Sequence, residues 1–347
     1  MTKSKGDSKG SKDNIAKGSK GKSDGFTNKE GSKGNVVLLA QGTFGCVFHP
    51  GITCTHEPLD AKYITKIHAS NEITAQNEIA VSKKVQTIPN YEQHFSPILE
   101  DCEVNLAKVN REEVEKCKFV KDDIHRKDDL QKPITYISTK IRFIEGKTLL
   151  EYVSQNSKYA TISALNRKLS ESINKLIEKE IVHFDLRENN MIVSKQGVPI
   201  IIDFGISIDF AKLKQNPSKK ILKNVFYAYT TQYKPWCIEI VLICFMVHHN
   251  PDQLSSEKIM EIFDEVMDNN DFANKPYLKT DFPKYRDHFK TQISTKPPKQ
   301  LMEYLLSTYK RWDMYSVAIL LIQMLEKTGH EPDETHVKQI KEKIGFI

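Results

Sequence analysis

Two polar residues stand where they could take part in one reaction. Asp185 lies five residues before Asn190, on a segment between a predicted helix and a β-like run. A loop held between two such elements can aim a carboxylate at a hydroxyl group while the amide oxygen binds a metal ion. The D-x-x-x-x-N spacing alone carries little weight, because roughly one chance match is expected in a chain of this size.

A second acidic residue ends an apolar run eighteen residues after Asp185. This run has the sequence Ile200-Ile201-Ile202-Asp203-Phe204-Gly205 and predicts a buried strand. A carboxylate at the end of such a strand projects into a cleft and can chelate Mg²⁺ on the β- and γ-phosphates of a nucleotide. The three polar side chains together therefore indicate phosphoryl transfer.

A glycine-rich turn is predicted between two short β-like runs at residues 36–39 and 47–48. Its sequence is Gln41-Gly42-Thr43-Phe44-Gly45. Backbone amides in such a turn can approach phosphates closely, because glycine has no Cβ atom. An ordinary hairpin turn has the same pattern, so this segment gains its meaning from a lysine on the next predicted strand, Lys66.

These segments resemble the protein kinase superfamily. The loop around Asp185 is similar to the catalytic loop of that family, and Asp203-Phe204-Gly205 is its metal-binding triplet unchanged. The resemblance implies that Asp185 accepts the proton of a substrate hydroxyl and that His183 braces the loop. It implies Asn190 and Asp203 as Mg²⁺ ligands. Arg187 stands where the family usually has a lysine; it can neutralise the transferred phosphate, although a planar guanidinium is not equivalent to an ammonium.

The resemblance extends to the nucleotide-binding part of that family. The glycine-rich loop over ATP is similar to Ala40-Gln41-Gly42-Thr43-Phe44-Gly45-Cys46-Val47, in which Ala40 stands in place of the first glycine. Lys66, in Ile64-Thr65-Lys66-Ile67, matches the lysine that contacts the α- and β-phosphates. We expect Glu78, on a predicted helix over residues 71–85, to be its partner, and Glu72 is the weaker candidate.

The linker between the two lobes of a kinase has a counterpart in Arg142-Phe143-Ile144-Glu145-Gly146. The resemblance implies that backbone groups of Arg142 and Ile144 lie near the adenine. An apolar strand that ends in Glu-Gly is equally common for structural reasons, so both interpretations stay open.

Beyond residue 205 the similarity is looser. Residues 231–236 resemble the substrate-binding end of the activation segment, where Ser/Thr-specific members place a threonine against the catalytic aspartate; Thr231 is the candidate. Glu239 is similar to the glutamate that comes after this segment, at a shifted spacing. Asp313, at the start of an apolar helix, resembles the aspartate that caps the catalytic loop in the family. We favour this capping role over an exposed charge, because a buried carboxylate needs backbone donors.

The predicted fold class is α+β, with a bilobal protein-kinase-like fold. We expect a disordered basic tail over residues 1–34, a small β-rich N-lobe with the glycine-rich loop over 35–145, and a C-lobe with the catalytic loop and activation segment over 146–347. The C-lobe is predicted to be mostly helical and rearranged or truncated, because about seventy residues separate Glu239 from Trp312 and only a short segment comes after that helix. The polar stretch at residues 101–132 is predicted to be an insertion or a mobile excursion.

Charge and cysteines bound the remaining possibilities. The tail holds nine lysines and four acidic residues, which leaves it +5 of the total charge of +6. A nearly neutral remainder argues against a large nucleic-acid surface on the fold, so contact with nucleic acid or an anionic surface is possible only through the tail.

The six cysteines form no CxxC pair, and we expect reduced thiols in an intracellular, cytoplasmic compartment. The longest apolar run, residues 238–247, is too short for a membrane span and predicts a buried helix or strand.

The sequence therefore predicts an ATP- and Mg²⁺-dependent protein kinase that phosphorylates Ser or Thr hydroxyls of protein substrates. It resembles kinases of large DNA viruses in residues 42–54 and in its short C-terminal end, which implies host cytoplasm or a virion as its place of action. A kinase-like phosphotransferase of small molecules is the first alternative. A nucleotide-binding pseudokinase scaffold is the second, although a scaffold has no need for this set of charged groups.

Overall fold

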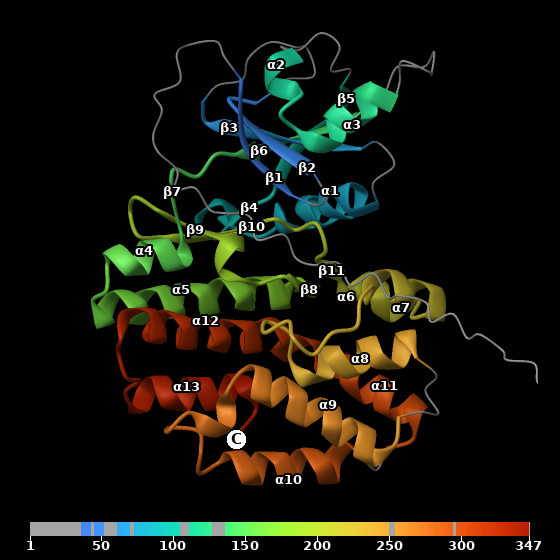
Figure 1. Ribbon diagram of the computed structural model, residues 1–347, viewed down its shortest axis with the longest axis vertical. Helices are drawn as coiled ribbons and strands as arrows, with labels where there is room; N and C mark the ends of the chain where they lie inside the picture. The colour runs from blue at the N-terminus through green and yellow to red at the C-terminus, as the bar shows by residue number, and fades with distance from the viewer. Residues whose placement is uncertain are drawn as a thin grey trace, which may run out of the picture. The chain divides into compact units, whose positions relative to one another are not determined.

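The N-terminal part of the fold is an antiparallel sheet of five strands in the order β1-β2-β3-β6-β5 (Figure 1). The computed structural model describes residues 36–42, 45–51, 61–69, 73–104, 111–126, 136–249, 254–293 and 296–346. The predicted basic tail, and Thr43 and Phe44 of the glycine-rich turn, lie outside these residues. The strands are β1 Val37–Gly42, β2 Gly45–His49, β3 Tyr63–Ala69, β5 Ile98–Val104 and β6 Tyr136–Arg142.

Helices cover both faces of this sheet. Helix α1, Ile73–Val85, packs one face through a small cluster that contains Ile79, Ile137 and Ile141. The short helices α2, Arg111–Val114, and α3, Lys118–Arg126, lie over the other face. Alternate residues of a strand point to opposite faces, which is why neighbours such as Tyr136 and Ile137 enter different clusters.

The described parts of the stretch at residues 101–132, which are 101–104 and 111–126, are more ordered than predicted. They begin inside β5 and continue through α2 and α3, whose Val114 and Val120 are buried against the sheet. The apolar residues are too sparse among the charged ones to indicate a helix by themselves. Only their burial by the sheet makes these two short helices stable.

The prediction of reduced thiols is wrong for the N-terminal sheet. Cys46 of β2 forms a disulfide with Cys117, between α2 and α3, and Cys102 of β5 is disulfide-bonded as well. A pair 71 residues apart cannot be found from spacing when the second cysteine lies between two helices that the sequence does not predict. Cys237 and Cys244 are buried free thiols, as predicted, and Cys54 lies outside the described residues.

A second sheet, in the order β4-β10-β9-β7, leads from the first sheet into the helical part. Its strands are β4 Phe95–Ser96, β7 Gly146–Thr148, β9 Met191–Ser194 and β10 Pro199–Ile202. Strand β4 comes from the N-terminal part of the chain and pairs in parallel with β10, which leads directly into Asp203. A two-stranded sheet pairs β8, Ile181–Val182, with β11, Ile208–Asp209. These short strands frame the segments that carry Asp185 and Asp203.

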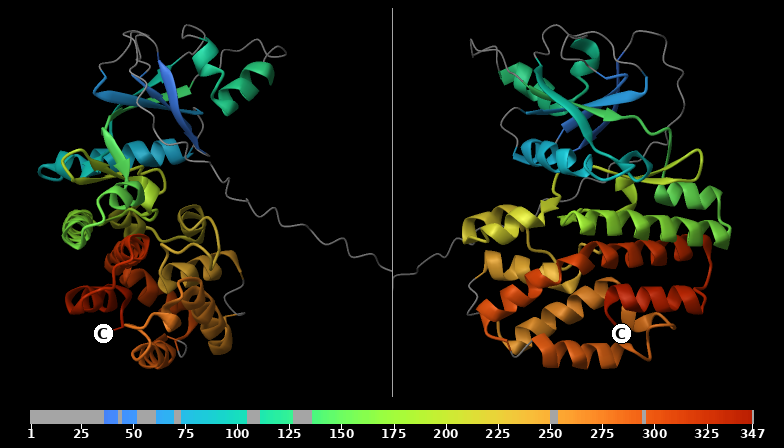
Figure 2. Two further views of the ribbon diagram at one scale, coloured as in Figure 1. Left: turned by 60° about the vertical axis from the view of Figure 1, so that its left-hand side comes forward. Right: turned by 180° about the vertical axis from the view of Figure 1, so that it is seen from behind.

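Ten helices make up the described part of the C-terminal region. They are α4 Leu149–Gln155, α5 Tyr159–Glu178, α6 Phe210–Gln215, α7 Lys219–Val225, α8 Ile238–His248, α9 Ser256–Asn269, α10 Phe282–Ile293, α11 Pro298–Ser307, α12 Trp312–Thr328 and α13 Glu334–Ile344. Figure 2 shows α5, α12 and α13 stacked one over another, and α12 contacts both of its neighbours. The β-rich N-terminal and helical C-terminal parts confirm the predicted α+β, kinase-like fold.

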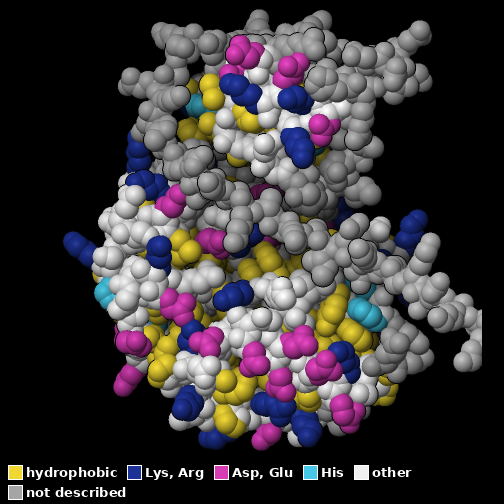
Figure 3. Space-filling model, in the orientation of Figure 1, with side chains coloured by type: hydrophobic (Ala, Val, Ile, Leu, Met, Phe, Trp, Pro, Cys, Tyr) yellow, Lys and Arg dark blue, Asp and Glu magenta, His cyan; other side chains and the backbone are white. Residues whose placement is uncertain are grey.

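The helical core follows the apolar pattern of the sequence. Residues at three- and four-residue spacing on α5, including Ile162, Leu169 and Ile173, are buried. Helix α8 is apolar on all sides and is buried on all sides, so the run at 238–247 is a helix and not a strand. Among the described residues, no helix is both long and apolar enough to cross a bilayer. On the face shown in Figure 3, acidic and basic side chains are intermixed over the helices.

Residues 36–347 form one compact unit. The expected boundary between lobes at residue 145 falls in the linker between β6 and β7 and stays a prediction.

Candidate active site

A buried lysine joins three elements of the fold. Lys66, on β3, donates from Nζ to Glu78 Oε2 of α1 at 2.9 Å and to Asp203 Oδ1, after β10, at 3.1 Å. Its side chain is 11% exposed and that of Glu78 is 3% exposed. Burial alone would lower the pKa of Lys66, but the two carboxylates outweigh it and raise this pKa. Burial also acts on Asp203, yet Lys66 holds the pKa of that carboxyl below its ordinary value.

Asp185 is held by two donors from different segments. The Asn190 side-chain amide donates to the Asp185 carbonyl oxygen at 2.9 Å and to Oδ2 at 2.8 Å. The phenol of Tyr233 donates to the other carboxylate oxygen, Oδ1. Burial raises the pKa of Asp185, and the hydrogen bond from Tyr233 opposes this shift. Because the nitrogen of the Asn190 amide is used by Asp185, the amide oxygen is the atom that remains for a metal.

The backbone before Asp185 is capped from α12. Asp313, in the first turn of that helix, accepts from the His183 amide at 2.6 Å and from the Phe184 amide at 3.1 Å. Asp313 is buried, so these two bonds satisfy a carboxylate that water does not reach. The predicted capping role of Asp313 is confirmed.

Two non-glycine residues at the site have left-handed backbone angles. Phe184, directly before Asp185, has φ of 69°, and Asp203 has φ of 63°. Such conformations cost about 1–3 kcal/mol each and persist where surrounding contacts enforce them. Phe184 is packed against Trp236, with ring centroids 4.9 Å apart, and its carbonyl accepts from the Trp236 indole at 2.9 Å.

Side chains around the Asp203 triplet link it to the catalytic loop. Phe204 is fully buried, and its ring lies edge-on to His183, with centroids 5.1 Å apart. The His183 Nε2 atom lies 3.1 Å from the Ile202 carbonyl, so His183 braces the loop against β10 as expected. Asn77 of α1 donates to the carbonyls of Gly205 at 3.1 Å and Ser207 at 2.8 Å. Sequence reasoning missed Asn77, because an amide on a helix is usually solvated.

The glycine-rich turn is described at its two flanks. Residues 40–42 lie on β1 and 45–47 on β2, with Ala40 opposite Val47, Gln41 opposite Cys46 and Gly42 opposite Gly45. A Cβ atom on Gly45 would lie 2.6 Å from the Ile67 carbonyl oxygen, whereas one on Gly42 would meet nothing within 4 Å. Gly45 is therefore required for the approach of β2 to β3. Open space at Gly42 fits a residue that faces a ligand.

The predicted linker residues lie at the end of β6. The Ser96 hydroxyl donates to the Arg142 carbonyl at 2.9 Å, and the Phe143 amide donates to the Lys62 carbonyl at 2.7 Å. The Arg142 guanidinium donates to the carbonyl oxygens of Glu92, at 2.5 Å, and Phe95, at 3.2 Å. These contacts fix the linker. The carbonyl of Arg142 keeps one lone pair for a ligand.

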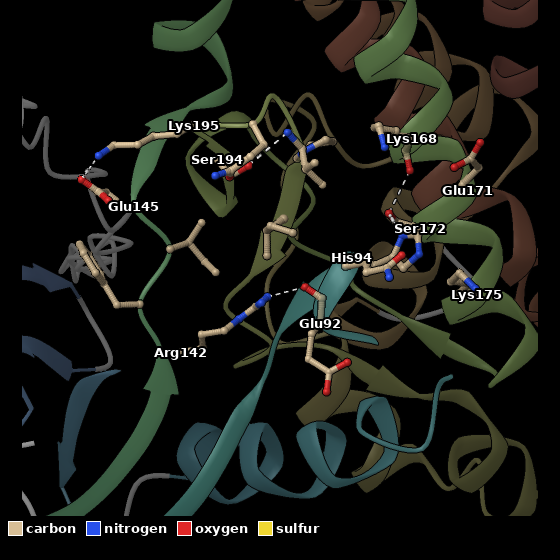
Figure 4. A pocket seen from close by; sticks show the side chains of 17 residues that line it. Glu92, His94, Arg142, Glu145, Lys168, Glu171, Ser172, Lys175, Ser194 and Lys195 are labelled. Atoms are coloured by element: carbon tan, nitrogen blue, oxygen red, sulfur yellow. Dashed lines mark hydrogen bonds and ion pairs between the residues drawn. The ribbon is translucent and has the colours of Figure 1, made fainter. Parts of the chain in front are cut away.

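A cavity of about 780 Å³ lies along this linker (Figure 4). It is bounded by residues 142–145, by α5 and by the β9–β10 hairpin, and Lys195 is ion-paired with Glu145 at its edge. His94 contributes a ring nitrogen 2.9 Å from the Ser172 hydroxyl. Lys66, Asp185 and Asp203 do not line this cavity, so the cavity is separate from the site that these three side chains form.

Residues 76–236 match the model of the ABC1 atypical kinase-like domain. This match agrees with the kinase-like fold. The matched stretch includes Glu78, Asp185, Asn190 and Asp203 and begins after Lys66. The chain is also similar to the serine/threonine-protein kinase PrkC of Bacillus subtilis (strain 168), with 28% identity over 107 residues. That alignment covers 30% of this chain and 16% of PrkC, so the chain matches only a small part of that relative.

The candidate site differs from the sequence prediction at the activation segment. The hydroxyl on Asp185 comes from Tyr233 and not from Thr231, whose carbonyl accepts from Asn269 at 3.0 Å. Spacing could not decide between the two, because residues 226–237 form no regular element. Arg187 has a 40% exposed side chain that approaches Glu188, at 3.5 Å, and its charge acts on Tyr233. Burial raises the pKa of the Tyr233 phenol, and the Arg187 guanidinium opposes this rise.

Glu239 occupies the first turn of α8 and is buried. It lines a cavity of about 310 Å³ together with Arg311. Glu239 and Arg311 thus line the same cavity, which agrees with a structural role for Glu239 despite its shifted spacing from residues 231–236.

The residues present fit an ATP–Mg²⁺ complex. Asp203 keeps a side chain that is 41% exposed, so its second oxygen is accessible, and the Asn190 amide oxygen is available. No group of three or more His, Cys, Asp or Glu side chains suited to a metal occurs among the described residues. A Mg²⁺ site in a nucleotide enzyme usually takes one or two protein oxygens, which act with phosphate and water.

Proposed function

We propose that this chain is an ATP-dependent protein kinase that transfers the γ-phosphoryl group to Ser or Thr hydroxyls. The observation that carries this proposal is the convergence of Lys66, Glu78 and Asp203 in one buried ion cluster, beside a braced loop that presents Asp185 and Asn190. A lysine and a carboxylate such as Lys66 and Glu78 are costly to bury, and Asp203 is the partly exposed member of the cluster. A phosphate-binding function explains why the chain keeps them together.

Each residue has a distinct role under this proposal. Lys66 orients the α- and β-phosphates, and Glu78 holds its ammonium in place. Asn190 and Asp203 would hold Mg²⁺. Asp185 accepts the proton of the substrate hydroxyl as that oxygen attacks. When bound, Mg²⁺·ATP supplies the phosphoryl group and the counter-charge that phosphoryl transfer needs.

Substrate positioning falls to the residues around the base. Arg187 can neutralise the transferred group with its charge, which also acts on Tyr233. The flanks of the glycine-rich turn at 40–42 and 45–47 cover the phosphates, and backbone groups of Arg142 and Ile144 face the adenine. Thr43 and Phe44 belong to the same turn by sequence.

The test is γ-phosphoryl transfer from ATP·Mg²⁺ to a panel of proteins, with Asp185→Ala beside the wild type. General-base catalysis contributes about 10²–10⁴-fold, so we expect a loss of that size with retained nucleotide binding. Asp264→Ala, which removes a surface carboxylate paired with Arg286, is the matched control and should transfer normally. Equal transfer by Asp185→Ala and the wild type would contradict the assignment.

A phosphotransferase of small molecules is the second candidate, because the family model matched is that of an atypical kinase-like domain. The same assay separates the two if free sugars and aminoglycosides are included as acceptors. Transfer only to such molecules would replace protein kinase by this alternative. Nucleotide binding without transfer to any acceptor would favour the pseudokinase scaffold.

An intracellular site of action, in host cytoplasm or a virion if the chain is viral, belongs to the same proposal. The disulfides of the N-terminal sheet weaken the part of the argument that used reduced thiols. Fractionation of cells that express the tagged chain, under thiol-blocking conditions, would determine both the compartment and the state of Cys46.

A further inference from the structure

The phenol of Tyr233 lies where an acceptor hydroxyl would have to lie. It donates to Oδ1 of Asp185, while Asn190 donates to Oδ2. Both carboxylate oxygens therefore already accept a hydrogen bond from the chain itself. A substrate hydroxyl that is to be deprotonated must make the same kind of bond to the same carboxylate.

The loop does not need Tyr233 to hold Asp185 in place. Asn190 binds both the backbone carbonyl and the carboxylate of Asp185, and Asp313 fixes the two preceding amides. These bonds come from the loop itself and from the buried helix α12. The bond from Tyr233 is additional to a support that is already complete.

The segment that carries Tyr233 is anchored on both sides of this residue, by the Thr231 carbonyl, which accepts from Asn269 at 3.0 Å, and by Trp236. Trp236 is buried, contacts the Tyr233 ring with centroids 5.2 Å apart and donates to the Phe184 carbonyl. Gln232 and Lys234, on either side of Tyr233, are exposed, and Tyr227 is 48% exposed. Tyr233 itself is half-buried. Its side chain can therefore leave Asp185 while the segment stays attached at Trp236.

We propose that Tyr233 occupies the acceptor position on Asp185 and competes with the substrate hydroxyl, so that it sets the affinity of the enzyme for its acceptor. This inference rests on the proposed phosphotransferase function. It assigns the competition to a hydrogen bond, so the phenol oxygen and not the ring is the group that matters. Nucleotide binding, on the other side of Asp185, is not affected.

The test compares the wild type with Tyr233→Phe, which keeps the ring and removes the hydroxyl. We expect the KM for the acceptor protein to fall about ten-fold, as suits one hydrogen bond to a charged group, with the KM for ATP unchanged. Tyr229→Phe is the matched control. Tyr229 belongs to the same segment but packs against Phe245 and His249 away from Asp185, and its variant should behave as the wild type.

Three results would overturn the proposal. A lower kcat with an unchanged acceptor KM in Tyr233→Phe would mean that Tyr233 positions Asp185. Identical kinetics for Tyr233→Phe and the wild type would mean that the phenol does not compete. An equal gain in Tyr229→Phe would mean that the segment loosens in general.

A separate measurement covers the case in which no acceptor is phosphorylated by any of these proteins, which would sink the proposed function itself. The rate of tyrosine nitration at each position would then be followed by mass spectrometry. Protection of Tyr233 in the wild type, lost in Asp185→Ala while the rate at exposed Tyr227 stays constant, supports the contact. An equal nitration rate of Tyr233 in both proteins overturns it.

Discussion

The N-terminal sheet and the helical region hold their functional side chains in different ways. Lys66 is fixed by two opposite charges, in a sheet whose two apolar clusters are small and which carries a disulfide to the α2–α3 segment. Asp185 is fixed by hydrogen bonds from the Asn190 amide, on a loop whose backbone is capped by Asp313 and which is backed by one large core. The sheet depends on ion pairing and a covalent link, and the helical region on packing. Substitutions in the two regions should therefore fail differently.

The largest effect is expected at Lys66. Lys66→Met removes the phosphate ligand and leaves Glu78 buried without its counter-charge, which costs about 3–5 kcal/mol of unfolding free energy. Phosphoryl transfer should be lost as well. Adding Glu78→Gln should restore most of the stability but none of the activity. Denaturant unfolding and ATP binding measure the two effects, and a Lys66→Met protein of unchanged stability would contradict the buried ion cluster.

Asp313→Ala tests the packed side of the comparison. The amides of His183 and Phe184 would lose their acceptor inside the protein, and we expect a loss of about 2–4 kcal/mol from two unsatisfied donors. Asp333→Ala is the control, because Asp333 caps α13 at the surface, where such a change costs about 1 kcal/mol. Thermal unfolding should rank the two variants in this order. The reverse order would remove the distinction between buried and exposed caps.

The disulfide should matter to the sheet alone. We expect Cys46→Ser/Cys117→Ser to lose about 2–4 kcal/mol, because the unfolded chain is no longer constrained by a long closed loop. Amide hydrogen exchange should rise in β2, α2 and α3 and stay unchanged in α12. Faster exchange in α12 would show that the two regions unfold as one unit.

The pH dependence contrasts the two acidic residues of the site. Burial raises the pKa of Asp185, whereas Lys66 lowers that of Asp203, so Asp185 is the carboxyl that protonates first as the pH falls. Because its pKa is raised, Asp185 stays in the protonated form, which cannot act as a base, up to a higher pH. The acid limb of the kcat/KM profile, which reports the free enzyme, should therefore lie above the ordinary aspartate range, and it should move to higher pH when Tyr233, which lowers this pKa, is changed to Phe. A limb at the ordinary aspartate pKa would contradict the burial of Asp185.

The smallest effect is expected at the surface of the helical region. Arg286 forms a two-bond ion pair with Asp264, at 2.7 and 2.6 Å, between α10 and α9. Both side chains are partly exposed, so Arg286→Met should cost about 0.5–1 kcal/mol and less in high salt. A loss as large as that at Lys66 would mean that charge pairs support both regions equally.

The sequence was sufficient to predict a contact where the residue occupies a defined position on a helix or strand. Asp203 directly follows a buried strand, Lys66 lies on a strand beside a helix that offers Glu78, and Asp313 begins an apolar helix; the structure has all three contacts. Their catalytic roles stay predictions. The helical spacing on α5 was sufficient for the same reason, because burial of one face follows from periodicity.

The sequence was not sufficient to predict contacts made by segments that have no regular secondary structure or that come from distant parts of the chain. Tyr233 reaches Asp185 because residues 226–237 bend in a way that no propensity encodes, and Thr231, two residues earlier, was the wrong choice. Cys46 and Cys117 meet because α2 and α3 fold onto the sheet. The role of Asn77 depends on the approach of α1 to the Asp203 triplet. Each of these is a tertiary contact between segments far apart in the chain.

Cys46 directly follows Gly45, the last glycine of the nucleotide turn, and Cys117 lies between the two helices on the outer face of the sheet. A movement of those outer helices would reach the turn through the disulfide as well as through the packed residues Val114 and Val120. A protein that binds α2 and α3 would therefore act on the glycine-rich turn, and a reductant that cleaves the Cys46–Cys117 disulfide would remove the covalent part of this connection.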